Sequence, residues 1–222
     1  MNPKFLQLAV FSLWGICVIL GLAVLAKHRN TPGEPIRPAG ESSVEQAVAR
    51  LSPAELRPFL AQDSAFTLIV LAHPRCPCTQ ATLHELQRLI PRLDGKVALH
   101  AYFAIPAGKT DDFAEGANLR LAQSLPGMKI TLIPAAEIVG KLGGGTSGQV
   151  IVFDHGGRLK FQGGITAGRG HEGDNPGEES IRALVATGST RLASTPVYGC
   201  SLREVRTVTT PGNPGLPAAL LR

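Results

Sequence analysis

An uncharged apolar run near the N-terminus, Phe5 to Ala26, restricts the architecture of this 222-residue chain more than any other feature. The run covers 22 positions, which is long enough to cross a bilayer as a helix. A buried core helix would keep an amphipathic pattern, and this run has none. We therefore predict a transmembrane anchor over residues 1–26. A signal peptide is the alternative, because Val24-Leu25-Ala26 places small residues at the processing positions.

Charges around this run bear on its orientation. Lys27, Arg29 and Arg37 follow the run, whereas Lys4 and the free amine precede it. The positive-inside rule alone therefore predicts that the rest of the chain lies in the cytoplasm.

The remainder of the chain suits one globular domain with a linker before it and an extension after it. Prolines and glycines recur between Asn30 and Gly40, so residues 27–41 are predicted to form a linker. Residues 42–188 can bury one core, and residues 189–222 form a loop-like C-terminal extension that contains Cys200. The net charge of +5 is carried by scattered basic residues, which argues against nucleic acid as a partner.

The order of predicted elements indicates the fold. Ser42 with Glu45, and Ser52 with Glu55, are capping patterns that predict two short helices. A strand, a helix and a second strand follow, then a further strand and helix, a hairpin and a last helix. The ranges are 66–72, 79–93, 97–103, 129–133, 134–142, 150–154 with 159–162, and 178–186. This order predicts an α/β, thioredoxin-like fold: a central mixed sheet flanked by helices, with an inserted strand and helix.

The cysteines are the strongest chemical signal. Cys17 lies in the apolar run and is expected to be inert. Cys76 and Cys78 flank Pro77 where a buried strand leads into a helix, and a helix N-terminus stabilises a thiolate. A disulfide between them would close a small, strained ring that is easily reduced. The pair therefore predicts thiol–disulfide exchange.

Roles for the thiols follow by analogy with Cys-x-x-Cys enzymes. Cys76 lies at the strand end, is expected to be the more exposed thiol, and would attack first. The neighbouring Cys78 would resolve the mixed disulfide. Cys200 would be a second resolving thiol or a spare one.

Two other hypotheses use the same residues. His73, Cys76 and Cys78 offer soft ligands for Cu(I), in which case the protein would handle or assemble a metal. With Cys200 they would also supply four ligands for zinc. The cysteines could also be purely structural in a thioredoxin-fold interaction module.

The glycine-rich stretches predict no cofactor. Gly168 to Gly173 matches GxGxxG literally, but the stretch does not open a helix inside a strand-helix-strand unit. Gly108-Lys109-Thr110 lacks the earlier glycine of a P-loop. Arg169 and His171 could hold an anion, although a solvated surface loop is the simpler interpretation.

Several stretches together resemble the RedB-like proteins, a membrane-anchored, thioredoxin-like bacterial family. They are His73-Pro-Arg-Cys-Pro-Cys78, Thr146-Ser-Gly-Gln149, Gly163-Gly-Ile-Thr166, Gly168-Arg-Gly-His-Glu-Gly-Asp-Asn175 and Thr195-Pro-Val-Tyr-Gly-Cys200. The resemblance implies a single-pass protein of the bacterial inner membrane whose domain faces the periplasm, against the charge rule. It also implies a redox role with a protein thiol, disulfide or electron donor as partner.

Two features depart from ordinary thioredoxins. No Trp precedes the first cysteine, and Thr146 to Gln149 stands where thioredoxins carry a cis-proline. Gly148 is expected to take a tight backbone conformation there, because glycine reaches dihedral angles that other residues avoid.

Overall fold

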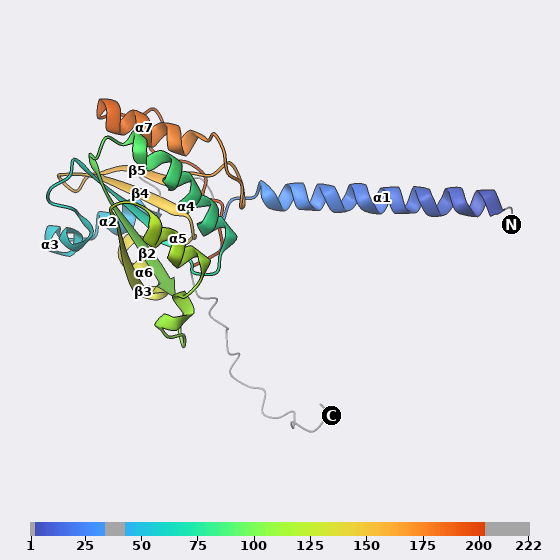
Figure 1. Cartoon of the computed structure of the whole chain (residues 1–222), viewed down its shortest axis with the longest axis horizontal. Helices are drawn as coiled ribbons and strands as arrows, with labels where there is room; N and C mark the ends of the chain where they lie inside the picture. The colour runs from blue at the N-terminus through green and yellow to red at the C-terminus, as the bar shows by residue number, and fades with distance from the viewer. Residues whose placement is uncertain (1–2, 34–42, 203–222) are drawn as a thin grey trace, which may run out of the picture.

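The computed structural model describes residues 3–33 and 43–202. Its first element, α1 (Pro3–Arg29), extends away from the rest of the chain as a lone helix (Figure 1). The helix is long and apolar enough to cross a membrane, and its large side chains, such as Phe11 and Trp14, are exposed. It continues through Lys27, His28 and Arg29, which the sequence assigned to the linker.

A five-stranded mixed sheet forms the centre of the domain. Its strands lie in the order β3-β2-β1-β4-β5. Strands β1 to β3 are parallel, and β4 and β5 are antiparallel to their neighbours. The bounds are β1 (Phe66–Ala72), β2 (Val97–Ile105), β3 (Met128–Pro134), β4 (Gln149–Asp154) and β5 (Leu159–Gly164).

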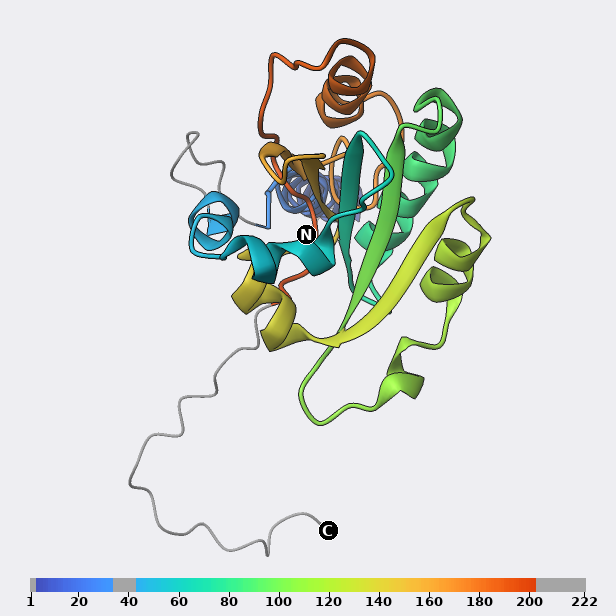
Figure 2. The same ribbon diagram turned by 90° about the vertical axis from the view of Figure 1, so that its left-hand side faces the viewer.

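Helices cover both faces of this sheet (Figure 2). Alternate side chains of β1 point to opposite faces, so Leu68 and Val70 enter one core cluster while Ile69 and Leu71 enter the other. The first cluster packs under α4 (Pro77–Leu89), α5 (Ala117–Ser124) and α7 (Pro176–Thr187). The second packs under α2 (Ser43–Val48) and α6 (Ala135–Leu142), beside α3 (Pro53–Leu56) and η1 (Arg57–Phe59). Because β1 is covered on both faces, its continuous apolar run is explained.

This is a thioredoxin-like fold, as the element order predicted. β1, α4 and β2 form a parallel strand-helix-strand unit, and β4, β5 and α7 form the hairpin and final helix. Most predicted bounds agree within a few residues, and the capping box of Ser52 and Glu55 is present. Ser42 lies outside the described residues.

Helix α5 and the short η3 (Asp111–Ala114) before it have no counterpart among the elements predicted from the sequence. Gly116 occupies the N-cap of α5 without a side-chain cap, and the helix is only eight residues long, so it lacks a start signal. Between β2 and β4 the chain therefore contains η3, α5, β3 and α6, and β3 extends the sheet beyond β2.

The described part of the C-terminal extension, residues 189–202, runs along β5. Thr195 and Ala193 pair with Gln162 through backbone hydrogen bonds, and the Gly164 N–H donates to Pro196. The extension thereby covers the β5 edge of the sheet and then turns toward the start of α4.

Candidate active site

The first turn of α4 positions the two thiols. Cys76 is the N-cap residue, with extended backbone, and Pro77 begins the helix where no N–H partner is needed. Asn118 of α5 donates from its side-chain amide to the Cys76 carbonyl oxygen at 3.0 Å. The Thr79 hydroxyl accepts the His73 N–H at 3.0 Å, which fixes the other end of the turn. The turn is therefore held by residues on both sides of the helix start.

The sulfur of Cys76 has two close partners from distant parts of the chain. Cys200 Sγ lies 2.9 Å away, although 124 residues separate the two cysteines. The Ser147 hydroxyl, in the loop before β4, donates to Cys76 Sγ at 3.1 Å. The same hydroxyl oxygen accepts the Cys200 N–H at 2.9 Å. Three side chains thus meet at one sulfur.

The exposure of the three cysteine side chains differs from what the sequence predicts. Cys76 is only 1% exposed and Cys78 is buried as well, whereas Cys200 is exposed. The expectation that Cys76 is the more exposed thiol of the motif is therefore wrong. The physical reason is that Ser147 and the Cys200 segment contact its sulfur, and neither contact can be read from the local motif.

The three thiols differ in acidity. Contact with the Cys78 thiol, followed by contacts with Cys200 and Ser147, lowers the pKa of Cys76 to about 3 against the opposing effect of burial. Contact with Cys76, and then burial, raises the pKa of Cys78. Burial and then the Cys76 contact raise the pKa of Cys200 to about 11. Cys76 is therefore the thiolate of the cluster, and its neighbours are proton donors.

His73 lies near the thiols and contacts Arg75 and Phe113. Its Nδ1 accepts the Arg75 N–H at 3.3 Å, and its ring meets the edge of Phe113 at 5.9 Å between centroids. Burial lowers the pKa of His73, more than the nearby Cys76 thiolate raises it. Within residues 3–33 and 43–202, no group of three His, Cys, Asp or Glu side chains is arranged to hold a metal ion. No observation thus favours the copper hypothesis, which stays a prediction.

Gly148 takes the backbone conformation expected of it. Its φ is +81°, and an added Cβ would lie 2.7 Å from Thr82 Oγ1 in α4. Its N–H donates to the Leu71 carbonyl oxygen at 2.7 Å, and no peptide bond in the described residues is cis. Glycine therefore lets the loop of Ser147 approach α4 closely without a cis-proline.

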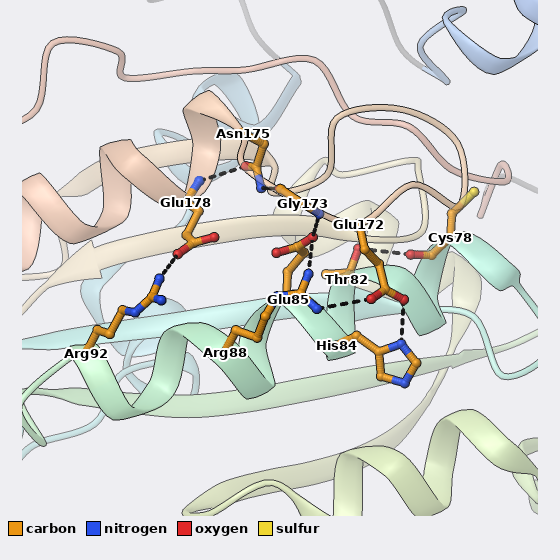
Figure 3. A network of polar contacts seen from close by, with 10 residues as sticks. All are labelled: Cys78, Thr82, His84, Glu85, Arg88, Arg92, Glu172, Gly173, Asn175 and Glu178. Carbon is orange, nitrogen blue, oxygen red and sulfur yellow. Dashed lines mark hydrogen bonds and ion pairs between the residues drawn. The ribbon is translucent and has the colours of Figure 1, made fainter.

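Hydrogen bonds and ion pairs connect a second loop, Gly168 to Asn175, to α4 (Figure 3). The Gly173 N–H donates to Glu85 Oε1 at 2.6 Å, and Glu85 is fully buried. Glu172 accepts from His84 at 2.6 Å and from Arg88 at 3.1 Å. The network holds this loop beside the helix that carries Cys78.

Arg169, in the same loop, donates to three backbone carbonyl oxygens. Its guanidinium donates to the Thr31 carbonyl oxygen at 3.1 Å and to the Gly199 carbonyl oxygen at 2.6 Å. The backbone N–H of Arg169 donates to the Arg29 carbonyl oxygen at 3.1 Å. Arg169 therefore links the end of α1 to the segment that carries Cys200. His171 is exposed in this loop.

Two residues of the site, Asn118 and Ser147, are not predicted from the sequence. Asn118 is 5% exposed on helix α5, where no motif marks it. Ser147 lies next to Gly148, the residue of this stretch for which the sequence predicts a backbone role. A hydroxyl before a glycine carries no signal of its own, because its role depends on a contact with Cys76 made across the fold.

Comparisons with known proteins find solved structures that share the fold of this chain at low sequence identity. No protein-family model matches the chain, and no curated protein matches it. An uncharacterized conserved protein from Geobacillus kaustophilus matches with a TM-score of 0.53 and 20% identity, covering 66% of this chain and 80% of that one. A hypothetical protein from Sinorhizobium meliloti matches with a TM-score of 0.54 and 17% identity, over 66% and 82%. A thioredoxin-like protein from Aeropyrum pernix is more distant, with a TM-score of 0.38 and 10% identity over 75% and 95%.

Proposed function

We propose that this protein is a membrane-anchored thiol–disulfide oxidoreductase with Cys76 as its attacking thiol. The observation that carries the proposal is the sulfur cluster: a lowered-pKa cysteine at a helix N-terminus with a second thiol 2.9 Å away. A structural cysteine pair would need no ionised member. The thioredoxin-like fold is compatible with this chemistry but does not by itself establish it.

The reaction follows from the roles of the thiols. The Cys76 thiolate attacks one sulfur of a partner disulfide, forms a mixed disulfide and releases one partner thiolate. A second thiol of the protein then loses its proton and attacks Cys76 Sγ, which releases the other partner thiolate. The partner gains two electrons and the protein gains one disulfide. The two partner thiolates take up one proton from the second thiol and one from water. The reverse sequence oxidises a partner dithiol.

Location in the cell is part of the proposal. We assign α1 to the bacterial inner membrane and the domain to its periplasmic face. The resemblance to membrane-anchored redox proteins supports this placement, whereas the basic last turn of α1 opposes it. Disulfide cycling is compatible with either side but needs different electron partners on each.

An exchange assay with variants tests the activity. The full chain in detergent should catalyse reduction of a disulfide-linked peptide pair by dithiothreitol, and Cys76→Ser should lower the rate at least about 100-fold, because the attacking thiolate is lost. The matched control is Cys17→Ser, which removes a thiol from α1 and should leave the rate unchanged. Full activity of Cys76→Ser would refute the proposed function.

A further inference from the structure

The segment that carries Cys200 pairs with the loop before β4 through an isolated antiparallel bridge. The Ser147 N–H donates to the Cys200 carbonyl oxygen at 2.8 Å, and the Leu202 N–H donates to the Gly145 carbonyl oxygen at 2.7 Å. Thr146 and Ser201 form the antiparallel bridge between them. Gly145 to Ser147, which we call the docking edge, therefore pairs its backbone with residues 200–202.

Gly199 permits this close approach. A Cβ at position 199 would overlap the Ser147 carbonyl oxygen, so a residue without a side chain is required just before the cysteine. Two positions after the cysteine, Leu202 is 4% exposed and packs in the core cluster that contains Leu142. The bound segment therefore has a small residue directly before the Cys and an apolar residue two positions after it.

Departure of this segment would leave specific groups without partners. The Ser147 N–H and the Gly145 carbonyl oxygen would lose their backbone partners, and Cys76 would lose its Cys200 contact. Backbone groups next to a protein interior need replacement partners, and an extended chain supplies them in the same pattern. A cysteine at the position of Cys200 in that chain would lie against the Cys76 sulfur.

We propose that the docking edge binds an extended, cysteine-bearing segment of the partner protein, and that residues 199–202 are its built-in occupant. This inference rests on the proposed function and names its substrate class: an extended segment with a small residue directly before its Cys and an apolar residue two positions after it. The same inference assigns the resolving role to Cys200.

The built-in segment and the partner segment compete for one edge during the reaction. The segment leaves, the partner binds, and the Cys76 thiolate takes the partner's cysteine sulfur into a mixed disulfide while the other partner sulfur leaves as a thiolate. Cys200 then returns, loses its proton and attacks Cys76 Sγ. The Cys76–Cys200 disulfide forms, the partner cysteine leaves as a thiol, and the returning backbone displaces the partner from the edge.

The test uses the full chain in detergent and a probe copied from its own sequence. The probe is a capped peptide, Pro-Val-Tyr-Gly-Cys-Ser-Leu, with its cysteine joined to thionitrobenzoate through a disulfide. Its reaction with Cys76 releases coloured thionitrobenzoate. A control probe carries N-methyl groups on the Cys and Leu amides, which removes two donors and keeps every side chain. We expect the control probe to react about tenfold more slowly, since two hydrogen bonds are lost.

Variants of the chain test the occupant and the resolving thiol separately. Gly199→Ala should expel the built-in segment and speed release from the first probe, whereas Gly140→Ala, where an added Cβ meets nothing, should not. Cys200→Ser should accumulate the Cys76–peptide mixed disulfide, detected by intact mass. Cys78→Ser should react more slowly, because it removes a contact that lowers the Cys76 pKa, yet proceed to the internal disulfide.

Each outcome decides a different claim. The claim that the docking edge binds the partner would be overturned if both probes released thionitrobenzoate at equal rates and Gly199→Ala had no effect. The role of Cys200 would be overturned if the Cys76–peptide mixed disulfide accumulated in Cys78→Ser and was fully resolved in Cys200→Ser. No release of thionitrobenzoate by any form of the chain would instead reject the proposed function, so the two failures are distinguishable.

Discussion

At the scale of single residues, the acidity of Cys76 is the property on which the chemistry depends. Contact with the Cys78 thiol lowers the pKa of Cys76 most, and contacts with Cys200 and the Ser147 hydroxyl lower it further. Cys76 also lies at the positive end of α4. The thiols around it keep their protons because their pKa values are raised. One thiolate and two proton donors in contact are suited to exchange without an external base.

The pH dependence of this thiolate is testable. A lowered pKa means that Cys76 stays ionised below the range in which ordinary thiols gain a proton, so the ultraviolet absorbance of one thiolate should persist in the reduced protein at about pH 5. The absorbance should disappear in Cys76→Ser and persist in Cys17→Ser. Absence of the signal in the wild-type protein near neutral pH would contradict the assigned acidity.

Residue-level prediction from sequence succeeded where the signal was local. The thiols at a strand-to-helix turn, and the positive φ of Gly148, follow from neighbours in the chain. The burial of Cys76 and the position of Cys200 do not, because both arise from a contact across 124 residues. Periodicity and capping contain no information on such a contact.

At the scale of elements, the loop Gly168 to Asn175 depends on α4 for its position. Glu85 accepts the Gly173 N–H and pairs with Arg88, while the Asn175 side chain caps α7 by accepting the Glu178 N–H at 2.8 Å. The literal GxGxxG of this loop therefore has a structural role between two helices. The sequence excluded a nucleotide site here but gave no sign of the buried glutamate as its anchor.

Glu85→Ala tests that anchor. The substitution removes the fully buried carboxylate that accepts the Gly173 N–H and pairs with Arg88, so we expect a loss of about 1–3 kcal/mol in the free energy of unfolding and faster hydrogen exchange at Gly173. The matched control is Glu137→Ala, which breaks the exposed pair with Lys141 and should cost less than about 0.5 kcal/mol. Equal losses in the two variants, measured by urea denaturation, would contradict the anchoring role.

At the scale of the whole molecule, the end of α1 meets the thiol site. The Gly33 N–H donates to the Val197 carbonyl oxygen at 2.8 Å, and Arg169 joins Thr31 to Gly199. The part of the predicted linker that the structure describes, Asn30 to Gly33, therefore contacts the domain. The Cys200 segment therefore contacts both the residues that follow α1 and the Cys76 sulfur.

The fold class was predictable because strand and helix periodicities recur along 66–186 and their order is diagnostic. The inserted helix α5 was not, because it is short and lacks a cap. Its omission mattered for the site, since Asn118 on α5 holds the carbonyl of Cys76. A short element without local signals can thus supply a residue that the motif needs.

Disulfide mapping during a redox titration tests the central claim most directly. The full chain in lipid discs would be equilibrated at stepwise potentials, alkylated under acid quench and analysed by peptide mass. We predict one reversible two-electron step that joins Cys76 to Cys200 and leaves Cys78 alkylated. A Cys76–Cys78 disulfide would contradict the role of Cys200, and the absence of any reversible step would contradict the oxidoreductase itself.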